Sequence, residues 1–333
     1  MKDKNIVVNN IEALNDALDI ALTKDESIVL YGQDAGYEGG VFRATKGLQQ
    51  KHGVERVWDS PIAENAMLGV AIGAATQGIK TIVEIQFSGF SFLAMNQLFT
   101  HAARFRTRSR GRYSCPIVVR MPMGGGIKAL EHHSESLEAL YATIPGLKIV
   151  LPSNPYDTKG LLLAAVNDPD PVVFFEPKKI YRSFKQEIPS SYYEVPIGKA
   201  NIVTNGKDLT IVSYGSPLID MIHLVNEMKM SHPDISIELI DLRTIKPIDE
   251  KTIFKSVIKT GRLLVVHEAT YSFSLSSEII SRVTSKCFYD LKAPPGKVTG
   301  WDITVPYANG EKYFFDMKQR TIDAIEAIMS EQF

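Results

Sequence analysis

Short apolar runs of strand length alternate with segments of helical periodicity along most of the chain. Between residues 11 and 22, Leu14, Leu18 and Ala21 fall on one stripe, which predicts a helix. Further helices are predicted at 45–51, from Ser60-Pro61 onward, at 134–142 and at 156–166, and strands at 27–31, 54–58, 81–87, 117–121, 149–151 and 172–176. This alternation is typical of a layered α/β fold with a parallel sheet.

A second run of the same kind follows a less regular stretch. From Pro177 to Lys199 no periodicity is clear, and Pro189 and Pro196 flank a polar, tyrosine-containing segment with the composition of a linker. Strands are then predicted at 209–214, 236–240 and 262–267, and helices at 219–229, 249–258, 274–285 and 318–330. We therefore expect two α/β domains, 1–190 and 191–333.

Composition and charge are those of an ordinary soluble protein. The 333 residues are 44% hydrophobic and 23% charged, with a formal net charge of −1, so no global field favours nucleic acid or an anionic membrane as partner. The two cysteines, Cys115 and Cys287, form no CxxC pair, which argues against a disulfide framework or a zinc site. No apolar run is long enough to span a bilayer, and the expected location is the cytoplasm.

The helix that begins near Glu64 carries the most informative chemistry. It has no other charge until Lys80. One interpretation is a helix-start carboxylate that faces water and is stabilised by the macrodipole. The helix also contains Gly69 and Gly73 among several alanines, so neighbouring backbone is expected to approach it closely, within the domain or across a subunit interface. A carboxylate there is expected to be partly desolvated, which suits it to sharing a proton with a bound base.

Three aromatic residues, Phe87, Phe90 and Phe92, follow the strand predicted at 81–87. Core packing explains most phenylalanines. Here glycine and serine neighbours indicate a turn at the end of a strand, where one ring is able to lie flat against a heterocycle.

A glycine run at 124–126 precedes the histidine pair His132 and His133. No Lys-Ser or Lys-Thr follows the glycines, so the run indicates a flexible loop rather than a phosphate-binding loop. Adjacent histidines point in different directions, which disfavours a shared metal. A structural role and general acid–base catalysis both remain open for them.

Two polar segments permit more than one interpretation. Arginine occupies every second position from Arg104 to Arg112, which indicates a solvated loop or a docking surface for an acidic partner, because a nucleic-acid site needs more stacking residues than Phe105 supplies. Asp168 and Asp170 alternate with prolines at a predicted helix exit. That pattern stops a helix, and its carbonyls and carboxylates also suit a hard or monovalent cation.

Several motifs are missing from the sequence. No GxGxxG follows a strand and no GxSxG elbow occurs, so dinucleotide binding and serine hydrolysis are unsupported. No Gly-Asp-Gly followed at a distance by Asn is found either. Nothing in the chain therefore predicts a site that holds a diphosphate through magnesium.

Taken in order, these segments resemble the beta subunit of the decarboxylating component of 2-oxo acid dehydrogenase complexes, over essentially the whole chain. The landmarks are GGVFRAT at 39–45, DSPIAE at 59–64, EIQF at 84–87, HSES at 133–136, PGLK at 145–148 and DLRTI at 241–245. The segment RSFKQE at 182–187 and the glycine run are most like bacterial pyruvate dehydrogenases.

The resemblance implies a transketolase-like pair of domains, the first binding the pyrimidine of thiamine diphosphate and the second assisting assembly. It implies an α2β2 heterotetramer in which the cofactor lies between an alpha and a beta chain, and a lipoyl acyltransferase core as a further partner. The alpha subunit of the family carries the magnesium-diphosphate motif, which accounts for its absence here. The implied substrate is a 2-oxo acid, and pyruvate is the one expected.

The resemblance also assigns site residues. Glu64 matches the glutamate that hydrogen-bonds the aminopyrimidine ring, Phe90 the ring that packs against it, and Ile62 and Gln86 lie nearby in the family. His133 matches the histidine at the mouth of the site, which handles substrate or acyl transfer to lipoamide.

Some family members bind a potassium ion, and the matching residues here are Ile117, Ala165, Val166, Asp168 and Asp170. The family often has Asn at the last of these positions.

Three functions are therefore weighed. The first is the catalytic beta subunit, specific for pyruvate or for branched-chain 2-oxo acids. The second is a transketolase-type or acetoin-cleaving subunit with a different acceptor. The third is a non-catalytic assembly subunit, against which the joint presence of Glu64, Phe90 and His133 argues.

Overall fold

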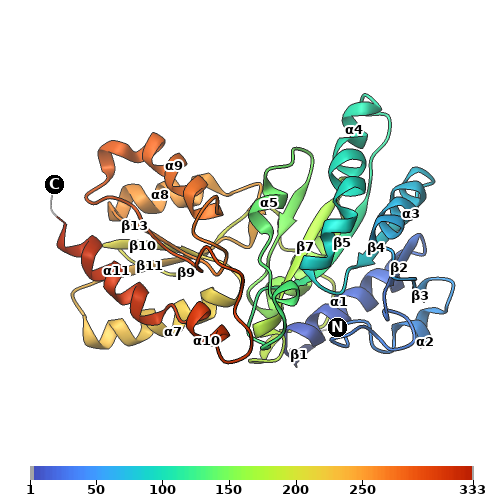
Figure 1. The fold of residues 1–333 in the computed structure, drawn as a ribbon, viewed down its shortest axis with the longest axis horizontal. Helices are drawn as coiled ribbons and strands as arrows, with labels where there is room; N and C mark the ends of the chain where they lie inside the picture. The colour runs from blue at the N-terminus through green and yellow to red at the C-terminus, as the bar shows by residue number, and fades with distance from the viewer. Residues whose placement is uncertain (1–3, 332–333) are drawn as a thin grey trace.

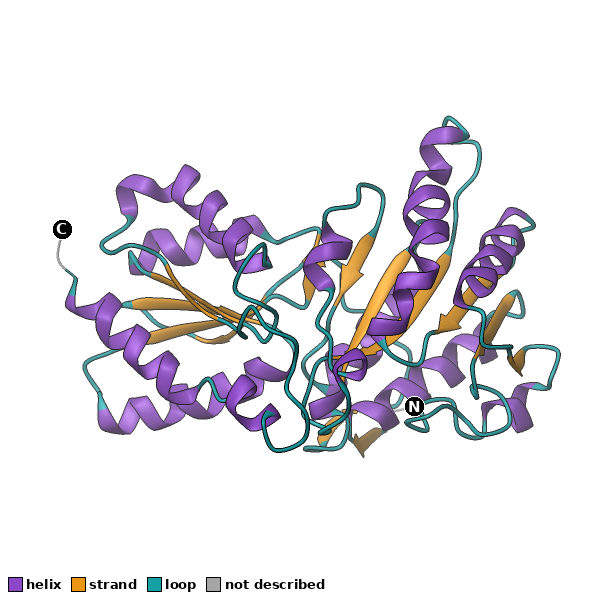
Figure 2. Cartoon of the chain, viewed as in Figure 1, coloured by secondary structure: helices purple, strands orange, loops and turns teal. Residues whose placement is uncertain are grey.

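The computed structural model describes residues 4–331 and contains two large β-sheets side by side, each with helices on both faces (Figures 1 and 2). The larger sheet has seven strands in the spatial order β12-β6-β7-β5-β4-β2-β3. All are parallel except β12, which runs antiparallel to β6. The strands are β2 (Ile28–Gly32), β3 (Val57–Asp59), β4 (Lys80–Glu84), β5 (Ile117–Met123), β6 (Lys148–Val150), β7 (Val172–Pro177) and β12 (Thr244–Lys246).

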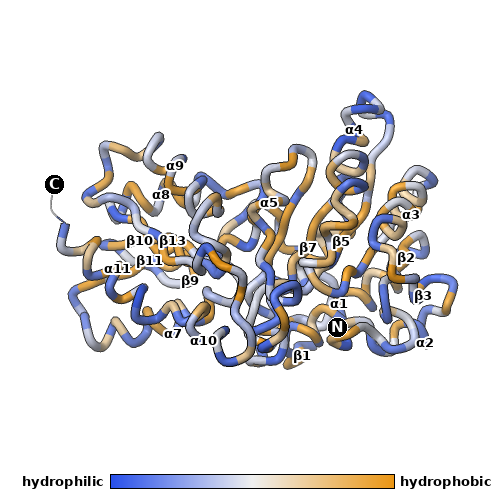
Figure 3. Tube along the Cα trace, viewed as in Figure 1, coloured by the Kyte–Doolittle hydropathy of each residue, from blue (hydrophilic) through white to orange (hydrophobic). Residues whose placement is uncertain are grey.

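Helices cover both faces of this sheet because its central strands are apolar on both sides. Every residue of β5 and β7 is buried, and Figure 3 shows these strands near the hydrophobic end of the scale. The α-helices of this half are α1 (Asn10–Lys24), α2 (Leu48–His52), α3 (Glu64–Thr76), α4 (Phe105–Arg108), α5 (Glu138–Ala142) and α6 (Pro155–Asn167). The 3₁₀-helices are η1 (Ser88–Ala94), η3 (Ala102–Arg104), η4 (Glu131–His133) and η5 (Lys178–Ile180), and η2 (Asn96–His101) is a π-helix.

The second sheet has five strands in the order β14-β13-β10-β11-β9, with only β9 antiparallel. The strands are β9 (Asn201–Thr204), β10 (Leu209–Ser213), β11 (Ile237–Asp241), β13 (Leu263–Val266) and β14 (Gly296–Val298). The helices are α7 (Ser216–Ser231), α8 (Glu250–Thr260), α9 (Leu275–Cys287), η6 (Phe288–Asp290), α10 (Glu311–Phe315) and α11 (Lys318–Ser330). A separate two-stranded antiparallel sheet pairs β1 (Asn5–Val8) with β8 (Gln186–Pro189).

The two halves share one core. A single cluster of buried side chains runs from Met67 and Val119 in the first half to Val212 and Ile240 in the second. Strand β12 belongs to the second half of the sequence but pairs with β6 of the first sheet. The halves are therefore joined by apolar packing and by main-chain pairing, which holds one rigidly against the other.

The α/β architecture with two mostly parallel sheets is confirmed, while several local predictions were wrong. The helix predicted from Ser60-Pro61 begins only at Glu64, after an irregular turn. The helix predicted at 134–142 is reduced to α5, because residues 134–137 are not helical. The segment from 177 to 199 contains η5 and the strand β8. Within residues 4–331, none of the helices combines the length and apolar character that a membrane crossing requires.

A buried ion-pair network lies in the middle of the first sheet. Arg120 of β5 is fully buried, and its guanidinium lies 2.7 Å from Glu84 Oε2 of β4 and 2.8 Å from Glu176 Oε1 of β7. The Tyr181 hydroxyl donates a hydrogen bond to Glu176 Oε2. One buried cation thus pairs with two buried carboxylates, one on each of the strands that flank β5.

We predict that Arg120→Met lowers the free energy of unfolding by about 3–5 kcal/mol, because two carboxylates are left buried without a counter-charge. Urea denaturation of the purified chain, followed by tryptophan fluorescence, measures the change. Adding Glu84→Gln and Glu176→Gln to Arg120→Met is expected to recover part of the loss. An Arg120→Met chain as stable as the wild type contradicts this account of the network.

Candidate functional site

The predicted site residues of the first half gather at the carboxyl ends of its parallel strands. Ligands bind at this edge of open α/β sheets, because the loops that leave the strands meet there. Gln33 and Asp34 follow β2, Gln86 and Phe87 follow β4, the glycine run follows β5, and Lys178 follows β7. The site is thus built by segments far apart in sequence.

Glu64 is the first residue of α3 and is only 4% exposed. The interpretation of a carboxylate facing water is therefore wrong for this chain. Gln33 Nε2 donates a hydrogen bond of 3.1 Å to Glu64 Oε1. Ala63 provides no side-chain cap for the helix, so the positive end of the helix dipole and the Gln33 amide are what stabilise this carboxylate.

A polar chain extends from Glu64 across the edge of the sheet. Asp34 is the neighbour of Gln33, and its Oδ2 accepts a hydrogen bond of 2.8 Å from Gln86 Nε2. Gln86 in turn precedes Phe87. Glu64 and Gln86 are thereby connected through residues at the ends of β2 and β4, as the resemblance implies for two residues of one site.

Phe87, Phe90 and His133 form an aromatic cluster beside this chain. The His133 ring centroid lies 4.4 Å from that of Phe87 and 5.1 Å from that of Phe90, in edge-on geometry. His132 lies farther out, with its ring 6.5 Å from Phe90, and is exposed. Of the two histidines, His133 is therefore the one that packs on Phe90.

The electrostatics around His133 favour a neutral imidazole. Burial lowers its pKa below the ordinary value, and the nearby Lys178 and His132 lower it further. Its Nδ1 is buried without a hydrogen-bond partner in the described structure. The Lys178 ammonium lies 5.5 Å from the centre of the Phe87 ring, and burial lowers the pKa of Lys178 to about 7. A neutral imidazole is able to accept a proton from a bound group.

Ile62, which is also predicted to lie near the cofactor, is 83% exposed. One face of α3 is exposed as well. Val70 lies on the surface, and a Cβ added to Gly73 would have no heavy atom within 4 Å. The sequence predicted that neighbouring backbone would approach the small residues of this helix. At Gly73, no other part of the described chain does so.

The five residues predicted for potassium lie at the opposite, amino-terminal edge of the sheet. Ile117 begins β5, and Ala165 and Val166 lie in the last turns of α6. Two oxygens of Asp168 lie 2.7 and 2.5 Å from Lys148 Nζ, and Asp170 Oδ1 lies 2.7 Å from Arg106 Nε. Both carboxylates are thus neutralised by this chain's own cations, which does not fit a bound potassium ion.

Part of the arginine run at 104–112 lies at the same edge of the sheet. Of its members, Arg106 forms the ion pair with Asp170, while Arg108 lies 3.2 Å from His101 Nδ1. Part of the run is therefore structural. Residues 4–331 contain no group of three or more His, Cys, Asp or Glu side chains placed to hold a metal ion.

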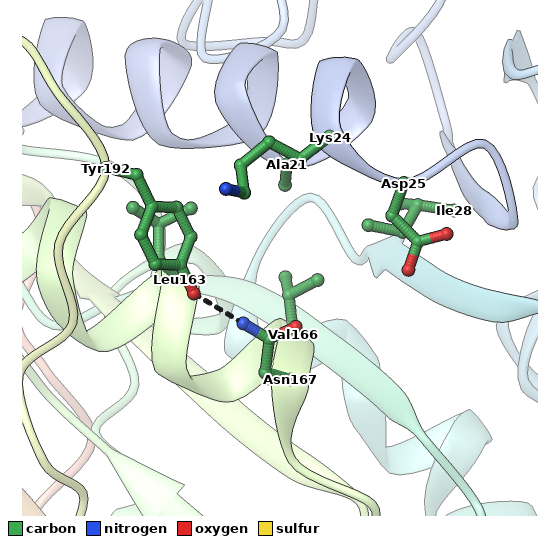
Figure 4. Close-up of a pocket in the computed structure, with 8 residues that line it drawn as sticks. All are labelled: Ala21, Lys24, Asp25, Ile28, Leu163, Val166, Asn167 and Tyr192. Carbon is green, nitrogen blue, oxygen red and sulfur yellow. Dashed lines mark hydrogen bonds between the residues drawn. The ribbon is translucent and has the colours of Figure 1, made fainter.

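A separate cavity of about 220 Å³ lies between α1 and α6 (Figure 4). The Lys24 ammonium lies 4.4 Å from the centre of the Tyr192 ring, and Asn167 donates a hydrogen bond to the Tyr192 hydroxyl. Its lining includes Ile28, the first residue of β2. The cavity is thus at the amino-terminal edge of the sheet, away from Glu64.

Sequence reasoning missed Gln33 and Lys178 as site residues. Each follows directly after a buried strand of the parallel sheet. That position is the signal that identifies them, because side chains just beyond the carboxyl ends of such strands converge.

Two family comparisons cover most of the chain. Residues 7–183 match the pyrimidine-binding domain of transketolase, and residues 198–319 match the transketolase C-terminal domain. A split-gene transketolase, described as an inactive beta4 tetramer, superposes with a TM-score of 0.80 over 98% of this chain and all of that one. At 18% identity that likeness shows the fold alone.

Two bacterial relatives are similar over nearly their whole length. The pyruvate dehydrogenase E1 component subunit beta of Mycoplasma genitalium is 66% identical over 97% of this chain and 99% of its own. The 2-oxoisovalerate dehydrogenase subunit beta of Bacillus subtilis is 45% identical over 98% of each chain. With two transketolase-type domains and relatives at these identities, the chain belongs to the family of 2-oxo acid dehydrogenase beta subunits.

Proposed function

We propose that this chain is the beta subunit of a pyruvate dehydrogenase, which with an alpha subunit catalyses oxidative decarboxylation of pyruvate and reductive acylation of lipoyl groups. The observation that carries the proposal is the buried Glu64 at the head of an uncharged helix, linked by Gln33 to the edge where Phe90 and His133 pack together. The name of the relative at 66% identity supports pyruvate as the substrate.

The second candidate is a branched-chain 2-oxo acid dehydrogenase. A relative that shares 45% identity over almost the whole chain is named for 2-oxoisovalerate. That 2-oxo acid is larger than pyruvate, so a larger substrate is the alternative. An acetoin dehydrogenase beta subunit and a non-catalytic assembly subunit are the remaining alternatives. A buried carboxylate and a neutral imidazole kept at one edge favour catalysis over an assembly role.

In the proposed site, Glu64 holds a proton at its carboxyl for exchange with a ring nitrogen of the bound pyrimidine. Its burial makes that hydrogen bond stronger than it is in water. Phe90 offers the flat apolar surface for the same ring, and Gln86 and Ile62 border it. When bound, thiamine diphosphate supplies the carbanion nucleophile and the electron sink for loss of carbon dioxide.

The proposed role of His133 is to handle a proton at the mouth of the site. Its neutral ring is suited to accepting a hydrogen bond from the substrate or from the lipoyl group that receives the acyl unit. Phe87 and Phe90 limit the ring's orientation, and water is excluded from Nδ1 by burial.

The alpha subunit is proposed to complete the site in an α2β2 heterotetramer. The alpha subunit would cover Ile62 and the exposed face of α3 with Val70 and Gly73, because residues 4–331 leave these apolar and small residues uncovered. The alpha subunit would also hold the diphosphate through magnesium. We further propose that residues 1–190 form the pyrimidine-binding domain, and that 191–333 help to dock a lipoyl acyltransferase core in the cytoplasm.

Co-expression with the alpha subunit tests the function. The complex is expected to reduce lipoamide with pyruvate as the 2-oxo acid, and this chain alone is expected to be inactive, because Ile62 and the diphosphate site need the partner. The test is a panel of 2-oxo acids with lipoamide as acceptor. Faster turnover of branched-chain acids would select the second candidate, and activity without lipoamide acylation would reject both.

Glu64→Gln in the same complex is expected to reduce decarboxylation by at least about 100-fold, on the scale of lost general acid–base catalysis. The amide keeps the size and the Gln33 contact but has no acidic proton. Single-turnover measurement of carbon dioxide release is the assay. Exposed Glu326→Gln on α11 is the matched control, and equal rates for the two variants would remove Glu64 from the mechanism.

Lys178→Met is expected to raise the pKa of His133, since the charge that disfavours its protonation is removed. Other groups facing this histidine are His132, which also lowers its pKa, and Glu131, which raises it. As the pH is lowered, a His133 with a raised pKa takes up its proton at a higher pH than in the wild type. NMR titration of ¹³C-labelled histidines, with His133→Gln for assignment, should therefore show its midpoint at higher pH than in the wild type; an unchanged midpoint argues against the electrostatic role of Lys178.

A further inference from the structure

The segment that joins β14 to α11 crosses back from the second half onto the first. We name its residues 300–315 the C-terminal strap. It ends in α10, and its side chains contact the loop at 124–131 that leads into the two histidines. Figure 1 shows this red segment reaching the centre of the molecule before α11 begins.

Glu311 makes the most specific contact between the strap and the loop. Its carboxylate is only 4% exposed. Oε1 accepts a hydrogen bond of 2.6 Å from the Gly126 N–H, and Oε2 accepts one of 2.7 Å from the Lys128 N–H. Charge-assisted bonds to backbone donors are roughly twice as strong as neutral ones, so this one side chain fixes two peptide groups of the loop.

The glycines of the loop are where the second half makes contact. A Cβ at position 125 would lie 2.0 Å from a ring carbon of Phe315, and one at position 124 would lie 2.0 Å from Glu268 Oε1. Gly124 and Gly126 also have φ values of +76° and +94°, which disfavour other residues. The glycine run therefore admits side chains of the second half at contact distance.

A third interaction lies directly before the histidines. The Tyr307 hydroxyl stabilises the Glu131 carboxylate, which holds the pKa of that carboxyl below its ordinary value. Glu131 opens η4, whose last residue is His133. Tyr307, Glu311 and Phe315 thus bracket the loop from 125 to 131.

His133 needs such support because its own side chain is held weakly. The ring makes edge contacts with Phe87 and Phe90, and its Nδ1 has no hydrogen-bond partner in the described structure. The position of the ring therefore follows the backbone that carries it. A loop with three successive glycines has more backbone freedom than any other sequence, and the strap removes that freedom.

We propose that Glu311 is a positioning residue for His133, and that the C-terminal strap makes the second half of the chain a working part of the active site. The statement about the loop rests on contacts alone, whereas the catalytic consequence rests on the proposed function. The two are tested separately.

Amide hydrogen exchange of the purified chain tests the loop. Glu311→Ala is expected to speed exchange at Gly126 and Lys128 by about 10- to 100-fold, the effect of losing a hydrogen bond to a charged acceptor. Amides of β5 should keep their protection. The isosteric Glu311→Gln should give a smaller rise, and the exposed Glu326→Ala should give none. Unchanged exchange in the loop, or an equal rise throughout β5, overturns the proposal.

Steady-state kinetics of the complex with the alpha subunit test the consequence. Glu311→Ala is expected to lower kcat for lipoamide acylation by about 10-fold while KM for the 2-oxo acid changes less than about 2-fold, because misplacing a catalytic group affects turnover more than substrate binding. Equal kcat for Glu311→Ala and wild type overturns the positioning role. An inactive wild-type complex rejects the proposed function instead, and the exchange experiment still decides whether the strap orders the loop.

Discussion

Charge neutralisation at Arg120 is the constraint on which the site depends. Glu84 and Glu176 lie near the carboxyl ends of β4 and β7, the two strands that flank β5, and their charges would repel each other without the buried guanidinium between them. With it, the strands lie in register and their exits are brought together. The Glu84 carboxylate also lies close to Gly40, where a Cβ would be 3.1 Å from Oε1. The space next to this network is therefore small, which favours glycine at position 40.

The sequence predicted most of the fold because strand burial and helix periodicity are local signals. Strands β5 and β7 are buried throughout and mostly apolar, and α1 has a clear stripe with a capping box at Asn9 and Glu12. The segments that were missed depend on distant contacts. Strand β12 forms only because β6 lies beside it, and β8 only because β1 does. No periodicity within three or four residues reveals such pairs.

Several candidate site residues could be singled out from the sequence for a related reason. Glu64 stands out because its helix has no other charge, and Phe90 and His133 fall in segments shared with the family. Gln33 and Lys178 were missed, since a glutamine or a lysine after a strand is ordinary in sequence. Their contacts appear only in the folded chain: the Gln33 amide donates a hydrogen bond to Glu64, and Lys178 is buried against Phe87. The ion pairs of Asp168 and Asp170 were hidden for the same reason.

The acid–base properties of the region between the halves depend on both of them. Lys178 comes from the first half and Glu268 from the second, and each lowers the cost of charging the other. Burial outweighs that attraction, so the pKa of Lys178 falls to about 7 and that of Glu268 rises to about 7. Groups with such values gain or lose a proton after small changes in their surroundings. Because Glu268 also packs on Gly124, the loop that leads to His133 is in direct contact with one of these two groups.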